Sequence, residues 1–385
     1  MQRSLIFILL AFVQCGIHSV REGETKIHER FLQTVKNSEA SKTASLLVHS
    51  DRLKLHVRSA SGTAGQSAAS PDQPFHVASI GKLFTAVVVY QLVEEKKLSL
   101  NDPAVRILGP EILRKLFEFQ GKDYSGQVTI DHLLSHKSGA ADYFESVEGG
   151  GRSVLQEIPA SPGRFWTSAD ILDFARTNQQ PVARPGEQFH YSDTGYVLLG
   201  LVVEKVTGKS FERNLEERIY QPLGMKHTYM HLRSEPAVQS SLALSTMMLG
   251  KLDATAFRSV SADWAGGGIV STAEDLLLFH RAVVSGKLIS SDNYKSMQGS
   301  SKFMDGIYYG RGLMTVRFGD MSAIMPKSAD LNGHSGLLST LLFYSPEYDT
   351  HIIANLGSTD DVGSTFEMMF WILQTVKEIQ GLQRP

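Results

Sequence analysis

Cysteine is nearly absent from this chain of 385 residues, in which Cys15 is the single example. One cysteine cannot close a disulfide within the chain, and a cysteine-rich metal site needs several. Cys15 also lies at the end of a predicted leader segment. The mature fold is therefore expected to contain no disulfide, no thiol nucleophile and no cysteine-ligated metal.

An excess of either charge is missing as well. The 38 Lys and Arg residues nearly balance the 40 Asp and Glu residues, which gives a formal net charge of −2 at pH 7. Such a chain has no basic field to attract the phosphates of nucleic acid, and it has no acidic tail. Nucleic acid is therefore excluded as an expected partner.

Apolar runs long enough to cross a bilayer are also missing, since the run from Val197 to Val203 is interrupted by Gly200. We expect no transmembrane segment. With 42% hydrophobic and 20% charged residues, the composition is that of an ordinary globular protein with a sizeable core.

The N-terminus has the pattern of a signal peptide. Arg3 precedes a short apolar run at residues 5–13, and this order of charge and apolar residues is typical of exported proteins. We expect a signal peptide at residues 1–20 and export to the periplasm or the medium. Lipid attachment at Cys15 is an alternative, but the bulky Gln14 before it fits a lipoprotein signal poorly.

The stretch from Phe75 to Lys97 has the pattern of a loop that enters a buried helix. Its apolar residues recur at the i, i+3 and i+4 spacing of a helix, and the positions between them are mostly apolar too. The spaced residues are Ile80, Leu83, Phe84, Val87 and Val88. Ser79 and Lys82 lie within this stretch, three positions apart and therefore on one helical face.

A serine and a lysine at this spacing can act as a nucleophile and its base. Lys82 can take the proton of Ser79 only if burial or nearby positive charge lowers the pKa of its amine. The start of the helix adds backbone N–H groups that suit an oxyanion. From this stretch alone a second interpretation stays open, in which Ser79 caps a core helix and Lys82 extends to the surface.

Strand-like segments gather at the two ends of the chain. Residues 44–49 and 53–58 form a predicted hairpin, and residues 59–70, which are rich in Gly, Ser and Ala, form a predicted loop. The predicted strands near the C-terminus are residues 312–318, 337–344 and 350–353. An amphipathic helix is expected at about residues 365–379.

This order of elements predicts an α+β fold, in which one antiparallel sheet is built from both termini and flanked by helices. The expected sheet lobe comprises about residues 40–75 and 300–385, and a mainly helical lobe at about 76–299 is inserted. Within it, the run from Trp264 to Gly268 predicts a close backbone approach beside the active centre rather than a phosphate loop, because no lysine follows.

Three short motifs follow one another along the chain. They are Ser79-Ile80-Gly81-Lys82, Tyr191-Ser192-Asp193 and His334-Ser335-Gly336. This trio resembles the serine β-lactamase and penicillin-binding protein family, in particular its branch of class C β-lactamases, D-alanyl-D-alanine carboxypeptidases and esterases. Further stretches that look like the same family are residues 98–103, 129–139, 185–192, 222–225 and 265–276. The resemblance covers about residues 44–358 and implies the β-lactamase/transpeptidase-like fold over residues 21–385.

The resemblance implies that Ser79 is acylated by a carbonyl substrate and that Lys82 and Tyr191 share the proton transfers. Beside ammonium groups, the phenol of Tyr191 is expected to ionise below its ordinary pKa of about 10. The oxyanion hole would consist of the backbone N–H groups of Ser79 and of Leu337, which is expected on the strand after Gly336.

The resemblance also implies a substrate-binding role for His334, Ser335, Gly336 and Asp193. Many relatives carry lysine at the position of His334, and a neutral imidazole binds a carboxylate less well. Most relatives carry asparagine at the position of Asp193. An ionised aspartate cannot donate an N–H to a substrate carbonyl, and it should raise the pKa of Lys82.

The sequence thus predicts an exported serine hydrolase of esters or amides, of the esterase or D-amino-acid peptidase or carboxypeptidase type, with weak or absent β-lactamase activity. A small molecule or peptide is the expected partner, and no metal or organic cofactor is expected. The alternative is a binding or sensor module that recognises a cell-wall peptide or a β-lactam without turnover, which the departure at Asp193 favours.

Overall fold

The computed structural model describes residues 16–145, 151–321 and 329–383. Its centre is a nine-stranded sheet with the order β11-β12-β13-β14-β15-β16-β1-β2-β3, in which neighbouring strands pair antiparallel. The strands are β1 (Thr43–Ser50), β2 (Leu55–Ala64), β3 (Ser67–Ala68), β11 (Ser301–Met304), β12 (Ile307–Tyr309), β13 (Met314–Val316), β14 (Leu331–Gly336), β15 (Thr340–Ser345) and β16 (Thr350–Asn355). The predicted antiparallel sheet from both ends of the chain is confirmed.

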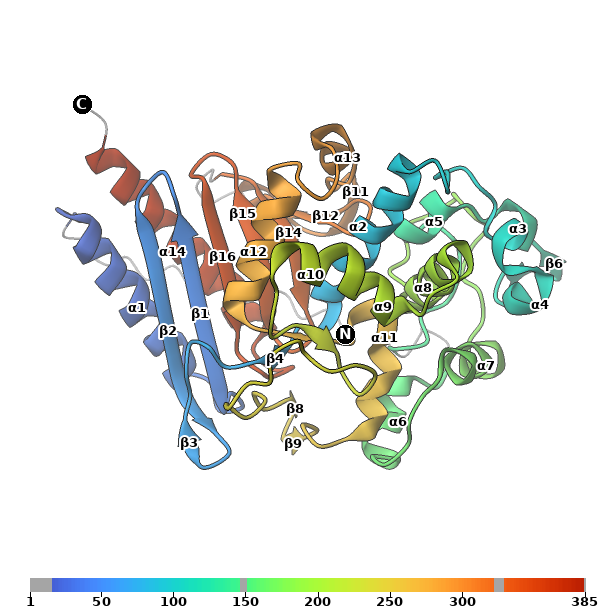
Figure 1. Cartoon of the computed structure of the whole chain (residues 1–385), viewed down its shortest axis with the longest axis horizontal. Helices are drawn as coiled ribbons and strands as arrows, with labels where there is room; N and C mark the ends of the chain where they lie inside the picture. Colours follow the sequence, from blue (N-terminus) through green and yellow to red (C-terminus); the bar gives the residue numbers. More distant parts are fainter. Residues whose placement is uncertain (1–15, 146–150, 322–328, 384–385) are drawn as a thin grey trace.

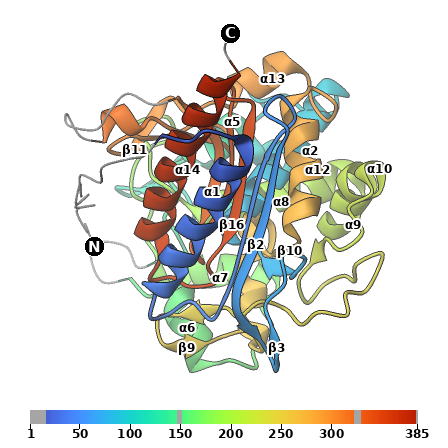
Figure 2. The same cartoon turned by 90° about the vertical axis from the view of Figure 1, so that its left-hand side faces the viewer.

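Both faces of the sheet are covered by helices. Side chains alternate across a strand, so the apolar residues of a buried strand face both sides and need a cover on each. On β1, Leu46 and Val48 belong to the core under α1 (Val20–Lys36) and α14 (Val362–Leu382), while Leu47 belongs to the core on the opposite side. Figure 2 shows α1 and α14 side by side over one face of the sheet. On the other face α12 (Ala273–Val284) packs against the central strands.

The helical part lies beside the sheet (Figure 1). Its helices are α2 (Gly81–Glu94), α3 (Ala104–Leu108), α4 (Pro110–Leu113), α5 (Ile130–Leu134), α6 (Val154–Ala160), α7 (Ser168–Asn178), α8 (Asp193–Thr207), α9 (Phe211–Leu215), α10 (Gln221–Leu223), α11 (Trp264–Gly267) and α13 (Ser291–Ser296). Small ladders complete it: β4 (Phe75–His76) with β10 (Ile269–Ser271) and β7 (Tyr229–Met230), β5 (Glu118–Phe119) with β6 (Lys122–Asp123), and β8 (Met248–Leu249) with β9 (Leu252–Asp253). The helix α2 is apolar on all sides and correspondingly buried.

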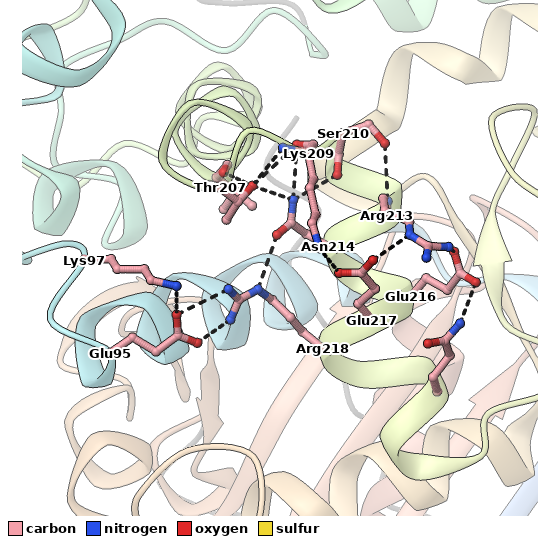
Figure 3. Close-up of polar contacts among 12 residues, drawn as sticks. Glu95, Lys97, Thr207, Lys209, Ser210, Arg213, Asn214, Glu216, Glu217 and Arg218 are labelled. Carbon is pink, nitrogen blue, oxygen red and sulfur yellow. Dashed lines mark hydrogen bonds and ion pairs between the residues drawn. The ribbon is translucent and has the colours of Figure 1, made fainter.

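Polar contacts tie the end of α8 to α9 and to α2 (Figure 3). The buried Asn214 donates its Nδ2 to the Thr207 hydroxyl and to the Ser210 carbonyl, at 2.9 Å each. Arg218 donates to the Asn214 Oδ1 at 3.3 Å and to Glu95, just past the end of α2, at 2.6 Å. These contacts hold the two long helices that supply the central residues of the site.

Two local predictions were wrong. The predicted loop at residues 59–70 contains the second half of β2 and all of β3. Leu337 was expected on a strand, but His334, Ser335 and Gly336 form the end of strand β14 and Leu337 lies in the turn to β15. In both cases small residues with low strand propensity are extended because neighbouring strands pair with them.

The predicted signal peptide falls largely on residues 1–15, which lie outside the described part of the chain, as does Cys15. The signal peptide and the lobe boundaries therefore stay predictions. Among the described helices, none combines the length and the apolar character that a bilayer crossing requires.

Candidate active site

Ser79 lies in a short 3-10 helix, η1 (Ala78–Ile80), that leads directly into α2. The preceding strand β4 pairs with β10, and the Val77 N–H donates to the Ile269 carbonyl at 2.9 Å. Between these elements Ala78 has a φ of 50°, a left-handed conformation that is uncommon for a residue with a Cβ. The fold thus holds Ser79 at a sharp strand-to-helix turn.

Lys82 is completely buried and lies one helical turn after Ser79. Its Nζ donates to the Ser79 Oγ at 3.2 Å, to the Gly266 carbonyl at 3.0 Å and to the Asp193 Oδ1 at 2.5 Å. The three donors of an ammonium are thereby used. The interpretation in which Lys82 extends to the surface is excluded by this burial.

Asp193 is the first residue of α8, and its buried carboxylate faces Lys82. Burial lowers the pKa of Lys82, but the carboxylate of Asp193, with further contributions from Tyr191 and Asp263, outweighs burial and raises that pKa above its ordinary value. The expectation that Asp193 holds Lys82 protonated is confirmed. Lys82 at rest is a cation rather than a free base.

The glycines of α11 allow this close arrangement. A Cβ on Gly266 would lie 2.5 Å from the Asp193 Oδ1, and a Cβ on Gly267 would lie 2.6 Å from the Ala78 carbonyl. A Cβ on Gly81 would in turn lie 2.7 Å from the Gly267 Cα. The close backbone approach predicted for the glycine run is therefore confirmed, and it brings α11 against the start of α2.

Tyr191 lies just before α8, with its ring centre 5.0 Å from the Lys82 Nζ. The ring packs against His136 at 4.2 Å between ring centres. Burial raises the pKa of the Tyr191 phenol above its ordinary value; Lys82 and the Ser79 hydroxyl lower it, whereas Asp193 raises it further. The expected lowering was wrong, because burial of the phenol, to which the carboxylate of Asp193 adds, outweighs the effect of the Lys82 ammonium.

The turn after β14 packs on the segment that carries Ser79. The Thr340 hydroxyl donates to the Val77 carbonyl at 2.8 Å. A Cβ on Gly336 would lie 2.8 Å from the Ala78 Cβ, so that only glycine permits this approach. As a result, Leu337 and Ser79 line the same cavity. The two residues predicted for the oxyanion hole are thus brought together, and their role stays a prediction.

His334 is buried behind the site rather than exposed in it. Its Nδ1 donates to the Ser335 carbonyl at 2.7 Å, so its Nε2 accepts from the Tyr309 hydroxyl at 3.2 Å. Burial, assisted by Lys82, lowers the pKa of His334 to about 3, which keeps the ring neutral. His334, Ser335 and Gly336 do not line the described cavity, whereas Asp193 does.

The cavity beside Ser79 has a volume of about 70 Å³. Most of its wall is apolar. The apolar lining side chains are Ala78, Phe144, Leu155, Ile158, Met247, Leu249, Ala254, Val260, Leu337 and Leu338. The polar lining residues are Ser79, His76, Glu145, Tyr191, Asp193 and Asp263.

Sequence reasoning assigned no role to Asp263 or to the acidic residues Asp142 and Glu145 near Asp193. Asp142 accepts the N–H of Asp193 at 2.9 Å, and burial together with Asp193 raises the pKa of Asp142 to about 8. Burial also raises the pKa of Asp263 to about 7; Lys82 opposes this and Asp193 adds to it. The signal available for Asp263 was its place directly before the glycine run.

Comparison with known proteins agrees with this geometry. A model of the Beta-lactamase family matches residues 33–364. Penicillin-binding protein 4* of Bacillus subtilis (strain 168) is 27% identical over 281 residues, which cover 69% of this chain and 57% of that protein. The Beta-lactamase of Escherichia coli (strain K12) is 26% identical over 248 residues, which cover 62% of this chain and 55% of that protein. The chain thus matches little more than half the length of these relatives.

Among solved structures, the D-amino acid amidase from Ochrobactrum anthropi SV3 in complex with L-phenylalanine amide superposes with a TM-score of 0.75 at 22% identity. The superposition covers 94% of this chain and 99% of the amidase. At this level of identity the similarity establishes the fold.

Proposed function

The chain belongs to the beta-lactamase family, and on that premise we propose that it hydrolyses small esters or amides through an acyl-enzyme on Ser79. The observation that carries the proposal is the contact of the buried Lys82 ammonium with the Ser79 hydroxyl, 3.2 Å apart. A buried lysine is costly unless it is paired or useful, and here it is paired and also faces a serine in a cavity.

In acylation the Ser79 Oγ attacks the substrate carbonyl and the bond to the leaving group breaks. Both Lys82 and Tyr191 hold their protons at rest. We therefore propose a relay, in which the Tyr191 phenol gives its proton to the leaving group as it receives the proton of Ser79. No group has to be a free base at rest in such a relay. In deacylation, water attacks the acyl carbonyl and the bond to the Ser79 Oγ breaks, while Tyr191 takes a proton from the water and gives its own proton to the Ser79 Oγ.

The developing oxyanion would be stabilised by the backbone N–H groups of Ser79 and Leu337. Loss of one such donor typically costs about 3 kcal/mol of transition-state stabilisation. Lys82 adds a fixed positive charge one turn away. His334 would act through its contact with Tyr309, which packs against Tyr191, and so hold the phenol in place.

Asp193 favours small esters and amino-acid amides over β-lactams. Its carboxylate cannot donate the hydrogen bond that the acylamino carbonyl of a penicillin would need. The solved structure that shares this fold is named a D-amino acid amidase. We include small D-amino acid amides in the proposed substrate range and expect weak or absent β-lactamase activity.

A binding module without turnover remains the second candidate. The observation that favours it is the raised pKa of both Lys82 and Tyr191, which slows any step that needs a free base. Such a module would accept an acyl group from a cell-wall peptide or a β-lactam and release it slowly.

The test is intact-mass spectrometry of the wild type and of Ser79→Ala after incubation with a fluorophosphonate and, separately, with a penicillin. Ser300→Ala is the matched control, because Ser300 is exposed and lies outside the cavity lining. We expect one fluorophosphonate adduct in the wild type and in Ser300→Ala, and none in Ser79→Ala. A penicillin adduct that persists for hours, without turnover of p-nitrophenyl butyrate, would favour the binding module. The absence of any adduct would refute Ser79 as nucleophile.

We also propose that the chain is exported through a signal peptide at residues 1–20. The charge and apolar pattern before Cys15 supports it. Expression of the full chain in a bacterial host, followed by fractionation and N-terminal sequencing, tests the proposal. A protein that stays in the cytosol with Met1 intact would refute it.

A further inference from the structure

Asp263 is an acidic residue with no assigned role at the wall of the cavity. It ends the 3-10 helix η4 (Arg258–Asp263) and is 91% buried, since its exposed fraction is 9%. None of the hydrogen bonds or ion pairs found in the described parts of the chain involves its carboxyl group. The next residue, Trp264, has a φ of 28°, an unfavourable backbone conformation for a residue with a Cβ.

Local packing leaves space for this carboxyl. The Tyr143 hydroxyl donates to the Ala262 carbonyl at 2.6 Å and so holds the backbone before Asp263. A Cβ on Gly267 would lie 2.5 Å from the Asp263 Oδ2, just as a Cβ on Gly266 would meet the Asp193 Oδ1. Two adjacent glycines therefore accommodate two carboxylates beside the same lysine.

Charge on the cavity wall is unbalanced. Among the described residues, the lining includes the carboxyl groups of Glu145, Asp193 and Asp263 but no Lys or Arg. Lys82 lies behind the wall and is bonded to the Asp193 Oδ1, and no hydrogen bond among the described residues reaches the Asp193 Oδ2. A buried carboxyl without a counter-ion is unfavourable. A cation in the cavity would relieve this imbalance.

We propose that the cavity binds the acyl part of a substrate that carries a free ammonium group, with the Asp263 carboxylate as its counter-ion and the Asp193 Oδ2 as a second acceptor. This inference rests on the proposed hydrolase function and narrows its substrate class. Since the remaining wall is apolar and the cavity is small, the fitting acyl group is an α-amino acid with an apolar side chain, presented as an ester or an amide.

A metal ion is a less suitable occupant. The described residues contain no group of three or more His, Cys, Asp or Glu side chains arranged to hold one. An ammonium needs fewer ligands than a hard divalent cation, and the apolar wall suits the carbon atoms attached to it.

The ammonium would also change the catalytic groups. Asp193 raises the pKa of both Lys82 and Tyr191. A substrate cation beside Asp193 and Asp263 offsets these negative charges, so the pKa of each group falls when the substrate binds. The proton relay then becomes easier for a cationic acyl group than for a neutral one. The preference should therefore be visible in kcat as well as in KM.

The test compares three p-nitroanilides that differ at one position: phenylalanine p-nitroanilide, its N-acetyl derivative and the 3-phenylpropionyl analogue, the first two as both enantiomers. p-Nitrophenyl butyrate and the fluorophosphonate adduct report hydrolase competence separately. For the wild type we expect kcat/KM with the better enantiomer of the free amine to exceed that of both neutral analogues at least about tenfold.

Asp263→Asn keeps the shape of the side chain and removes its charge, so the ratio of amine to N-acetyl activity should fall about tenfold or more. Asp292→Asn makes the same change at an exposed position on α13 and should keep the wild-type ratio. If Asp263→Asn does not fold, competitive inhibition of the wild type by 2-phenylethylamine but not by 3-phenylpropionate gives an independent answer.

The outcomes separate the two proposals. Equal activity on amine and neutral analogues in an enzyme that cleaves p-nitrophenyl butyrate would overturn the ammonium site and leave the hydrolase intact. An unchanged ratio in folded Asp263→Asn would overturn the role of Asp263. A protein with no Ser79 adduct and no hydrolysis of any substrate would overturn the proposed function and this inference with it.

Discussion

The Lys82 ammonium and the Asp193 carboxylate lie 2.5 Å apart, and both side chains are buried. This ion pair keeps Lys82 charged and turns one of its three N–H donors toward Ser79. A neutral amide at position 193 would accept the same hydrogen bond without the charge. Asp193 therefore keeps Lys82 protonated.

Asp193→Asn should increase acylation by β-lactams. The amide removes the carboxylate that raises the pKa of Lys82, and it adds an N–H donor for an acylamino carbonyl. We expect acylation of Ser79 by a penicillin to become at least about tenfold faster, as measured by intact mass over time, which corresponds to about 1.4 kcal/mol in the barrier. Asp193→Ala is the control, because it removes the charge without supplying a donor. If both variants react at the wild-type rate, position 193 does not decide the selectivity.

Lys82→Met should destabilise the fold more than the loss of its contacts alone would suggest. Removal of one partner from a buried pair leaves the carboxylate of Asp193 uncompensated, with a typical cost of about 3–5 kcal/mol. The double variant Lys82→Met with Asp193→Asn should recover most of that stability. Urea unfolding of the wild type, both single variants and the double variant gives the coupling free energy. Additive single effects would contradict a strong pair.

The order of motifs in the sequence predicted that Ser79, Lys82, Tyr191 and Asp193 belong to one site. The structure brings the four together, with Lys82 behind the wall of the cavity that the other three line. Their spacing within helices and their order along the chain carry this information. Asp263 could not be identified in the same way. Its place beside Asp193 arises only when α11 packs against α2 and α8, and no sequence spacing records that contact.

The pairing of β14 and the effect of burial on Tyr191 could not be predicted from the sequence either. Strand β14 contains Gly333, Ser335 and Gly336 and has little intrinsic strand propensity, yet it is central because β13 and β15 pair with it on both sides. For Tyr191, the sequence could suggest a neighbouring cation, but the direction of its pKa depends on burial, which only the folded chain defines.

Gly336→Ala should impair catalysis more than stability. The added Cβ would lie 2.8 Å from the Ala78 Cβ and from the Val77 carbonyl oxygen, which forces the end of β14 away from Ser79. If Leu337 supplies an oxyanion donor, its displacement should lower kcat on p-nitrophenyl butyrate about 100-fold or more.

Gly381→Ala is the matched control, since a Cβ there meets no atom of the described residues within 4 Å. It should keep the wild-type kcat, and thermal unfolding of both variants reports their stability. An active Gly336→Ala with a wild-type kcat would argue against Leu337 as an oxyanion donor.

The stability of the wild type should depend on pH through Asp263. Burial raises the pKa of Asp263 in the folded state to about 7, against about 3.9 for an unfolded aspartate. Among the charged neighbours, Lys82 opposes this shift and Asp193 adds to it. Asp263 also faces the phenol of Tyr143. A raised folded-state pKa gives a stabilising contribution that is complete below pH 3.9 and is lost as the pH rises through 7. Relative to Asp263→Asn, the wild type should therefore lose free energy of unfolding between about pH 5 and 8, by at most about 1.4 kcal/mol per pH unit. Urea unfolding of both proteins at pH 5, 6, 7 and 8 measures this difference, with Asp292→Asn as the exposed control. A difference that stays constant across this range would show that Asp263 does not titrate there.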